Sequence, residues 1–336
     1  MPLPAALAKA RIDGFILAIL AAVAVATLLP AQGAFAAGFD VAIKVAIAVL
    51  FFMYGGRLSS QEALAGLTHW RLHLTILACT YVAFPLVGVA LRPLQGRVLP
   101  DLLFAGVLYL CAIPSTVQSS ITFTSIARGN VAGAIVSASL SNLLGVVLTP
   151  AVVLVTMSAS GGIQVGAGAI VDLVVQILLP FVAGQASRRW TAQWLAANNS
   201  WLKLVDRGVI VAVVYSAFSR GMREHMWSMV SAPDLAVLTV LLLALLAFML
   251  WFTRALATRL GFGRGDRIAI QFCGTKKSLA TGLPMALVLF PGQPVGLLVL
   301  PLMIFHQAQL MACSVIAQRY GNDAEQVGGE ASARPG

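Results

Sequence analysis

The sequence predicts an all-α integral membrane protein with ten transmembrane helices, arranged as two inverted repeats of five. Composition is the first observation: 59% of the residues are hydrophobic and only 10% are charged, whereas soluble chains carry about 25% charged residues. The apolar runs are the second, because they approach span length and are too long for the alternating strands of a β-barrel. The third is a polar, helix-breaking interruption of the fourth run and of the ninth.

Counting apolar runs of membrane-span length along the chain gives ten helices in order. They are Gly14–Leu29, Phe39–Tyr54, Leu72–Leu91, Leu102–Thr124, Val131–Met157, Ala169–Ala186, Leu204–Phe218, Leu235–Phe252, Ile268–Phe290 and Val295–Ala317. Residues 1–320 are therefore expected to form a single membrane domain. The segment 321–336 is polar and rich in glycine, so it is expected to be a disordered tail.

The first run also has features of a secretory signal peptide. Lys9 and Arg11 precede it, and Ala34-Phe35-Ala36 follows it in the manner of a cleavage site. The run reaches span length, however, and its removal would leave an odd number of helices. We expect it to remain as the first span.

Basic residues between the runs predict the orientation. With a cytoplasmic N-terminus, 15 Lys and Arg residues fall inside, and 4 fall outside (Arg92, Arg97, Arg220 and Arg223). The remaining three of the 22 are lysines within spans. This bias predicts that both termini are cytoplasmic. The net charge of +10 is thus topogenic, and no basic run resembles a nucleic-acid-binding patch.

The two halves of the chain resemble each other. Each has five spans, and the fourth is interrupted in both, by 113–120 in the first half and by 273–278 in the second. Five is an odd number, so the second half enters the membrane upside down relative to the first. Broken helices at matching positions of inverted halves are the best pointer in a sequence to the central site of a transporter.

Two adjacent lysines mark the second interruption. Lys276 and Lys277 lie within an otherwise apolar stretch, and an ionised lysine at the centre of a bilayer costs roughly 2.5–3.5 kcal/mol on insertion scales. Gly274, Thr275 and Ser278 beside them can open the helix and offer polar partners. This pattern favours a solute site at mid-membrane; the alternative is a cytoplasmic loop between two short spans.

Polar residues on other spans are further candidates for this site. Pro114 disrupts the fourth span and is followed by the hydroxyl and amide residues Ser115, Thr116, Gln118, Ser119 and Ser120. Ser137 and Asn142 lie on the fifth span, where small residues also serve helix packing. His306 on the last span could relay protons or simply bond a neighbouring helix.

Enzyme and cofactor sites find little support in the sequence. It contains no HExxH, GxSxG or P-loop motif and no paired carboxylates at depth. An intramembrane hydrolase using Ser119 with His306 is conceivable, but no spacing supports it. The four cysteines lie in apolar segments without zinc-ligand spacing, so neither a metal cofactor nor a disulfide is expected.

The sequence resembles the SBF-like branch of the bile acid:sodium symporter superfamily over about residues 14–318. The most specific segments are Arg57-Leu-Ser with His73-Leu, Gly129-Asn130 through Leu148-Thr149-Pro150, Lys277-Ser278-Leu279 with Gly282-Leu-Pro-Met285, and Pro301 through His306 with Ala308-Gln309. The resemblance implies residence in a bacterial inner membrane. It also implies a panel (about 14–54 and 169–218) and a core (about 72–157 and 235–317), in which the broken helices four and nine cross.

In sodium-coupled members of that superfamily, cations bind behind the crossing, and the resemblance locates the matching positions here. The cation-binding glutamate falls at Gln271 and a downstream amide ligand at Thr275. A Ser-Asn pair resembles Ser119-Ser120, and a glutamine of the third span falls near Thr80. Two hydroxyl ligands of the fifth span become Ala134 and Ala138, with Ser137 and Asn142 nearby. These departures make sodium coupling by the usual ligands doubtful.

The sequence therefore predicts a secondary transporter of a small organic anion that works by alternating access. The candidate coupling ions are Na⁺ and H⁺. We hypothesise that a lysine replaces the sodium, either as a fixed charge or, because burial disfavours the charged form, as a proton-exchanging group. The alternative is a non-transporting regulator of ion or envelope homeostasis that keeps the same scaffold.

Overall fold

The computed structural model describes residues 14–57, 69–158, 171, 174–223, 228 and 230–332, and every named element in these ranges is a helix. Five of the helical segments are long and apolar enough to cross a membrane: Gly33–Arg57, Trp70–Leu94, Val131–Met157, Ala232–Arg259 and Val295–Asp323. Shorter apolar helices cover Leu17–Leu28, Asp101–Ala112 and Val174–Ala186. The prediction of an all-helical membrane protein is confirmed.

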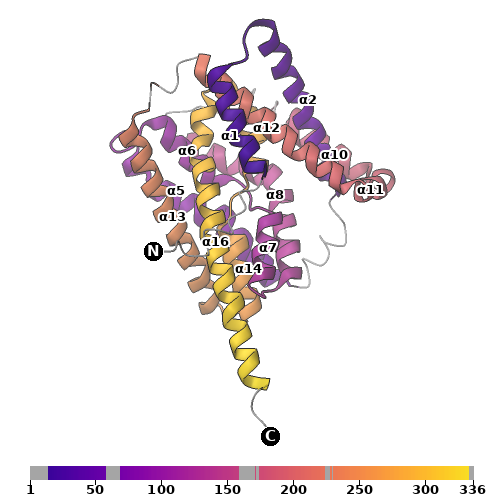
Figure 1. Cartoon of the computed structure of the whole chain (residues 1–336), viewed down its shortest axis with the longest axis vertical. Helices are drawn as coiled ribbons and strands as arrows, with labels where there is room; N and C mark the ends of the chain where they lie inside the picture. The colour runs from indigo at the N-terminus through magenta and orange to yellow at the C-terminus, as the bar shows by residue number, and fades with distance from the viewer. Residues whose placement is uncertain are drawn as a thin grey trace, which may run out of the picture.

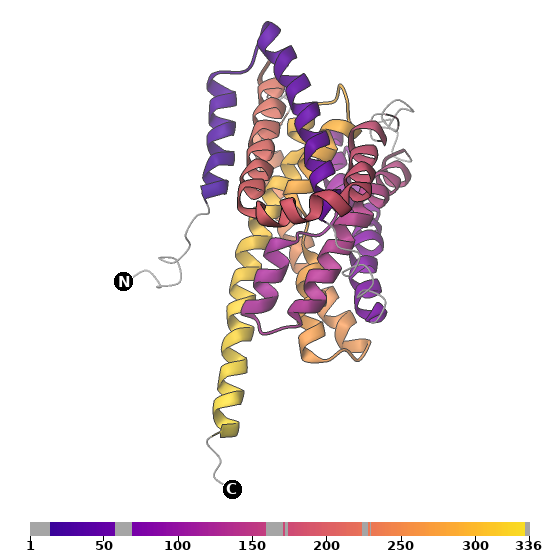
Figure 2. The same cartoon turned by 90° about the vertical axis from the view of Figure 1, so that its right-hand side faces the viewer.

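The helices form two packed groups, which Figures 1 and 2 show from perpendicular directions. The first group contains α1 (Gly14–Leu28), α2 (Gly33–Arg57), the π-helix η3 (Val174–Leu178), α10 (Leu179–Ala186), α11 (Arg188–Ala197) and α12 (Asn199–Arg223). The second contains α4 (Trp70–Ala78), the π-helix η1 (Cys79–Ala83), α5 (Phe84–Ala90), α6 (Asp101–Ala112), α7 (Gln118–Ile126), α8 (Val131–Ser158), α13 (Ala232–Arg259), α14 (Arg264–Thr275), α15 (Leu279–Leu289) and α16 (Val295–Ser332).

Small residues and ion pairs between α2 and α12 hold the first group together. Gly55 on α2 and Gly184 on α10 let the two helices touch, because a Cβ on either glycine would overlap a backbone carbonyl of the other helix. Asp40 on α2 accepts a hydrogen bond from Arg220 on α12 at 3.0 Å. The amphipathic helix α11 was not among the elements expected from the sequence.

Both helix interruptions predicted from the sequence are present in the second group. α6 ends at Ala112 and α7 begins at Gln118, because Pro114 can neither donate a backbone hydrogen bond nor allow helix at the preceding residue. α14 ends at Thr275, and α15 begins at Leu279 with Ser278 as its N-cap. The N-terminus of α15 is buried in the protein, whereas the first residue of α7, Gln118, is exposed.

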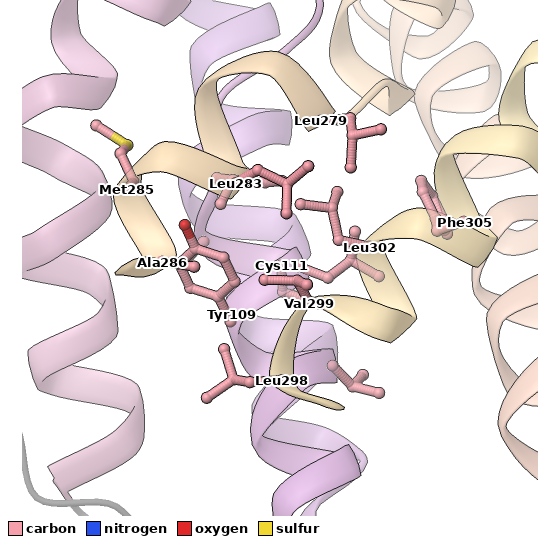
Figure 3. Packing of buried hydrophobic residues seen from close by; sticks show 14 of the residues in the cluster. Tyr109, Cys111, Leu279, Leu283, Met285, Ala286, Leu298, Val299, Leu302 and Phe305 are labelled. Carbon is pink, nitrogen blue, oxygen red and sulfur yellow. The ribbon is translucent and has the colours of Figure 1, made fainter. Parts of the chain in front are cut away.

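Apolar packing fixes α6 against α15 and α16 behind these interruptions. Figure 3 shows the Tyr109 ring beside Leu283 and Ala286, with its hydroxyl directed toward α15. That hydroxyl donates to the carbonyl of Gly282 at 2.6 Å, so the ring fills apolar space while its polar end is satisfied. Cys111 lies near Val299 and Leu302 of α16 in the same view.

Some expected boundaries differ from the structure. α16 continues to Ser332, where a disordered tail was expected from residue 321; the segment contains Ala324, Glu325 and Gln326, which favour helix. α12 is longer than the expected span 204–218. The start of the expected span 169–186 lies partly outside the described residues.

Candidate functional site

The two broken helices meet at their interruptions and are joined there by hydrogen bonds. The backbone N–H of Ser278 donates to the carbonyl of Pro114 at 2.8 Å, and the Ser115 hydroxyl donates to the carbonyl of Cys273 at 2.6 Å. Asn142 on α8 donates to the carbonyl of Ser115 at 2.7 Å and accepts from the Thr281 hydroxyl at 2.8 Å. We call this arrangement the crossing.

Lys277 occupies the centre of the crossing. Its side chain is fully buried, and Nζ donates to the carbonyl oxygens of Thr80 at 3.1 Å, Cys111 at 2.9 Å and Ile113 at 2.8 Å. The ammonium also lies 4.2 Å from the centre of the Phe84 ring, in a cation–π contact. Three acceptors match the three hydrogens of a lysine ammonium, which is the arrangement that a charged lysine requires.

The three carbonyls are free for Lys277 because of local helix defects. In a π-helix, each carbonyl accepts from the N–H five residues later, and the N–H of Phe84 accordingly donates to the carbonyl of Cys79 in η1. The next carbonyl, that of Thr80, would pair with position 85, which is a proline and has no N–H. The carbonyls of Cys111 and Ile113 lie at the end of α6, where the helical ladder stops. A buried carbonyl without a hydrogen-bond partner is costly, so each of these three carbonyls requires a donor, which Lys277 supplies.

Lys276 is equally buried but has a different environment. It has no exposed surface, and within the described part of the chain Nζ has no hydrogen-bond partner. The ammonium position lies 3.7 Å from the centre of the Phe123 ring and 5.9 Å from that of Phe272. The titratable groups that interact with it electrostatically include the thiols of Cys273 and Cys313 and the imidazole of His306. Lys276 therefore sits in an aromatic and apolar box.

Backbone geometry explains why two neighbouring lysines point to opposite environments. Lys276 has φ −79° and ψ 150°, and Ser278 is also extended. Successive side chains alternate sides in extended backbone, whereas on an intact helix they would diverge by only about 100°. The break therefore directs Lys277 toward α5 and α6 and directs Lys276 toward α7.

Gln309 on α16 holds the backbone of Lys277 from both sides. Its Oε1 accepts from the Lys277 N–H at 2.8 Å, and its Nε2 donates to the Lys277 carbonyl at 2.8 Å. Nε2 also lies 2.8 Å from Nδ1 of His306. The same Nδ1 lies 3.2 Å from the Lys277 carbonyl, so His306 and Gln309 both contact the backbone of Lys277.

A cavity of about 750 Å³ lies between the two helix groups, on one side of the crossing. The second group lines it with the N-terminal residues of α7 and α15 and with parts of α8 and α16. The first group contributes apolar side chains such as Phe15, Phe51 and Ile210, and a cluster of charged ones: Arg57, Lys203, Asp206 and Arg207. This charged cluster was not predicted as part of the site.

The candidate residues predicted from the sequence divide between the cavity and the interior. Those that line the cavity are Gln118, Ser119, Asn142 and His306. The others, Ser120, Ser137, Thr80, Gln271, Thr275, Lys276 and Lys277, are buried behind it. The lysines thus lie in the protein interior rather than in a loop, but neither is part of the cavity wall.

Two alternative chemistries gain no support from the geometry. The Ser119 hydroxyl bonds Thr116 at 2.7 Å, while His306 bonds Gln309, so these two residues do not form a nucleophile–base pair in the described structure. Within the described ranges, no three His, Cys, Asp or Glu side chains gather as a metal-binding group.

Comparison with known proteins decides the family. The model of the SBF-like CPA transporter family matches residues 13–322. The chain belongs to this family, within the bile acid:sodium symporter superfamily. It is a membrane transport protein of that superfamily.

Similar proteins cover nearly the whole chain. It is 51% identical over 308 residues to "Uncharacterized protein PA2026" of Pseudomonas aeruginosa, with 92% of each chain covered. It is 44% identical over 320 residues to "Putative symporter YfeH" of Escherichia coli, covering 94% of this chain and 95% of that protein. The mouse protein "Sodium/bile acid cotransporter 7" is 30% identical over 317 residues, covering 92% of this chain and 93% of the relative.

The positions that the superfamily resemblance assigns to cations are engaged otherwise in this SBF-like protein. Gln271 donates to the carbonyl of Leu250 at 3.0 Å and accepts from the Tyr320 hydroxyl at 2.9 Å. The Thr275 hydroxyl bonds Thr253 at 3.1 Å. Both side chains are buried and form hydrogen bonds with other residues of this chain. Their oxygen and nitrogen atoms therefore do not face an open ion site.

The remaining cation positions are also occupied by structural contacts. Ser137 lies 2.7 Å from Nδ1 of His73, and the Thr80 hydroxyl donates to the carbonyl of Ile76 at 2.9 Å. Thr80 takes part in the crossing through its carbonyl, not through the side chain predicted from the sequence. Ala134 and Ala138 are fully buried and offer no side-chain oxygen.

Proposed function

We propose that this SBF-like protein is a secondary active transporter of a small organic anion, with the Lys277 ammonium in the role that a bound sodium ion has in its coupled relatives. The single observation that carries the proposal is the set of three carbonyl contacts to Lys277 Nζ at the crossing. A lysine that makes these contacts supplies a positive charge and three donors to the broken helices. No dissociable cation is then needed to hold them together.

The charge of the cavity supports an anionic solute. Among the described residues, its lining contains Arg57, Lys203 and Arg207 and one carboxylate, Asp206. The wall opposite carries the N-termini of α7 and α15, which bear partial positive charge and favour anions. His306 adds a polar side chain to the same lining. A carboxylate or sulfonate is the chemical group that fits this surface.

The proposed cycle moves the first helix group, as the panel, against the second, as the core. In the ten-span inverted topology that we propose for the inner membrane, Arg57, Lys203 and Arg207 belong to the cytoplasmic side. The cavity would then represent the inward-facing state. Alternating access would close this cavity and open another on the opposite side of the crossing.

The proposal is tested with purified and reconstituted protein. A thermal-shift screen of organic acids at two sodium concentrations should identify ligands, because a bound ligand stabilises by mass action. Uptake of such a ligand into proteoliposomes should proceed equally in sodium and choline buffers. Uptake that requires sodium, and loses that requirement in variants of Gln271 and Thr275, would refute the lysine substitution. Binding without uptake in any gradient would favour the non-transporting regulator.

A further inference from the structure

Arg57 begins one of the sequence segments most typical of the SBF-like branch, and the crossing does not use it. It is the last residue of α2 and lies in the cavity wall. An arginine that only marks the cytoplasmic side of a membrane needs no more than exposure to water. The Arg57 side chain is instead only 24% exposed and is paired with Asp206 on α12.

The pair leaves one edge of the guanidinium unused. Nη1 donates to Asp206 Oδ2 at 2.8 Å, whereas Nε and Nη2 are buried and have no hydrogen-bond partner among the residues that the structure describes. Nε and Nη2 form the side edge of the planar guanidinium, where two parallel N–H groups match the two oxygens of a carboxylate. A buried, always charged donor pair without an acceptor is costly. Both nitrogens are shielded from solvent in this state, so a solute in the cavity would reach them when the Arg57 side chain, which belongs to the cavity wall, turns toward it.

Asp206 orients this edge and leaves the surroundings cationic. One of its oxygens holds Nη1, and the other, Oδ1, is buried without a partner. Lys203 and Arg207 lie on the same helix, one turn or less from Asp206, and line the same cavity. The two extra cations exceed the single carboxylate, so an incoming anion is attracted even though Asp206 is close.

We propose that the Nε–Nη2 edge of Arg57 binds the carboxylate or sulfonate group of the solute. This inference rests on the proposed function. It assigns recognition of the anion to the first helix group rather than to the buried lysines. The acidic group would then be held by one helix group while the rest of the solute faces the N-termini of α7 and α15 on the other. A bound anion would in this way link the two groups that move during transport.

The test measures binding of benzoate and benzenesulfonate to the purified full-length protein, with benzamide as the uncharged control. Arg57→Lys keeps a charge for Asp206 but loses the fork, and the double variant Arg57→Gln with Asp206→Asn removes both charges without leaving a buried carboxylate unpaired. Both should bind the anions about tenfold to a hundredfold more weakly than the wild type. Arg92→Lys is the matched control, because Arg92 is a partly buried arginine outside the cavity whose Nε has no partner among the described residues. The affinity of this variant for the two anions should equal that of the wild type.

Two results would overturn the inference: wild-type affinity in both Arg57 variants, or an absence of anion binding by the wild type. The outcomes also separate this inference from the proposed function. If proteoliposomes take up an anion and the KM is the same in Arg57→Lys, the role of Arg57 is wrong while transport stands. If Arg57 determines anion binding but the anion never crosses the membrane, transport is wrong while the binding site stands.

Discussion

Replacing each of the two buried lysines by methionine should have opposite consequences for stability. Methionine has nearly the length of lysine but no charge, so both variants preserve volume. Lys277→Met would leave the carbonyls of Thr80, Cys111 and Ile113 without a donor in the interior. Lys276→Met removes an amine that has no hydrogen-bond partner and replaces it with an apolar group in an apolar box.

The magnitudes follow from these contacts. An unsatisfied buried polar group costs about 1–3 kcal/mol, and removing one partner of a buried charged network costs about 3–5 kcal/mol in total. We therefore expect Lys277→Met to lower the free energy of unfolding by about 3–5 kcal/mol. Lys276→Met loses only a cation–π contact of about 0.5–2 kcal/mol and gains by no longer burying an amine, so its stability should stay within about 1 kcal/mol of the wild type.

Thermal unfolding of the detergent-purified protein, followed by intrinsic fluorescence at a single heating rate, measures both effects. For a chain of this length, the loss in Lys277→Met corresponds to a fall in apparent Tm of about 4–7 °C. Lys276→Met should unfold within about 2 °C of the wild type. Equal losses in the two variants, or a larger loss in Lys276→Met, would refute the assignment of the structural cation to Lys277.

Three further outcomes are expected. Lys277→Ala should leave a pocket lined by three carbonyls, so methylammonium or Na⁺ should restore part of its Tm; a variant that responds to neither would contradict a cation site there. Uptake should depend on pH through Lys276, the lysine without an acceptor, so Lys276→Met should flatten the pH profile; a persisting profile would assign proton exchange elsewhere. Gly55→Ala should lower Tm by several degrees, because its Cβ would overlap the Phe181 carbonyl, and the exposed Gly38→Ala, which meets no neighbour, should not.

Much of the fold could be predicted because its determinants are local. Apolar length locates the spans, and Pro114 and the polar run before Ser278 locate the two breaks that the structure contains. The π-helix at 79–83 was missed, although Pro85 five residues after Thr80 is a signal for it. The helix α11 was missed because a short amphipathic segment does not register in a count of apolar runs; its exposed Trp190 and Trp194 mark it.

The site was less accessible to sequence reasoning because it depends on which way side chains point. Helical periodicity cannot predict where a side chain points within a helix break. The sequence therefore left open which of Lys276 and Lys277 faces the site. Arg57 and Asp206 are 149 positions apart. Arg57 belongs to a segment typical of the family, but nothing in the sequence indicates Asp206 as its partner. Only the packing of α2 against α12 brings them together beside the cavity.

A lysine at the crossing has a consequence for energy coupling that a bound ion does not have. A sodium ion can leave on the opposite side of the membrane and thereby couple transport to its gradient. In the cycle that we propose, the ammonium of Lys277 is covalently attached and would instead return with the core each time. Its three carbonyl acceptors hold the charged form, so it contributes electrostatic support without exchanging a particle. Any coupling must therefore use another group that can change its charge between the two states. Lys276 meets that condition, because its amine has no acceptor in this state and lies against Phe123, a residue of the cavity wall. The two lysines would then divide between them the roles that a single sodium ion combines in the coupled relatives: one stabilises the crossing, and the other carries the exchangeable charge.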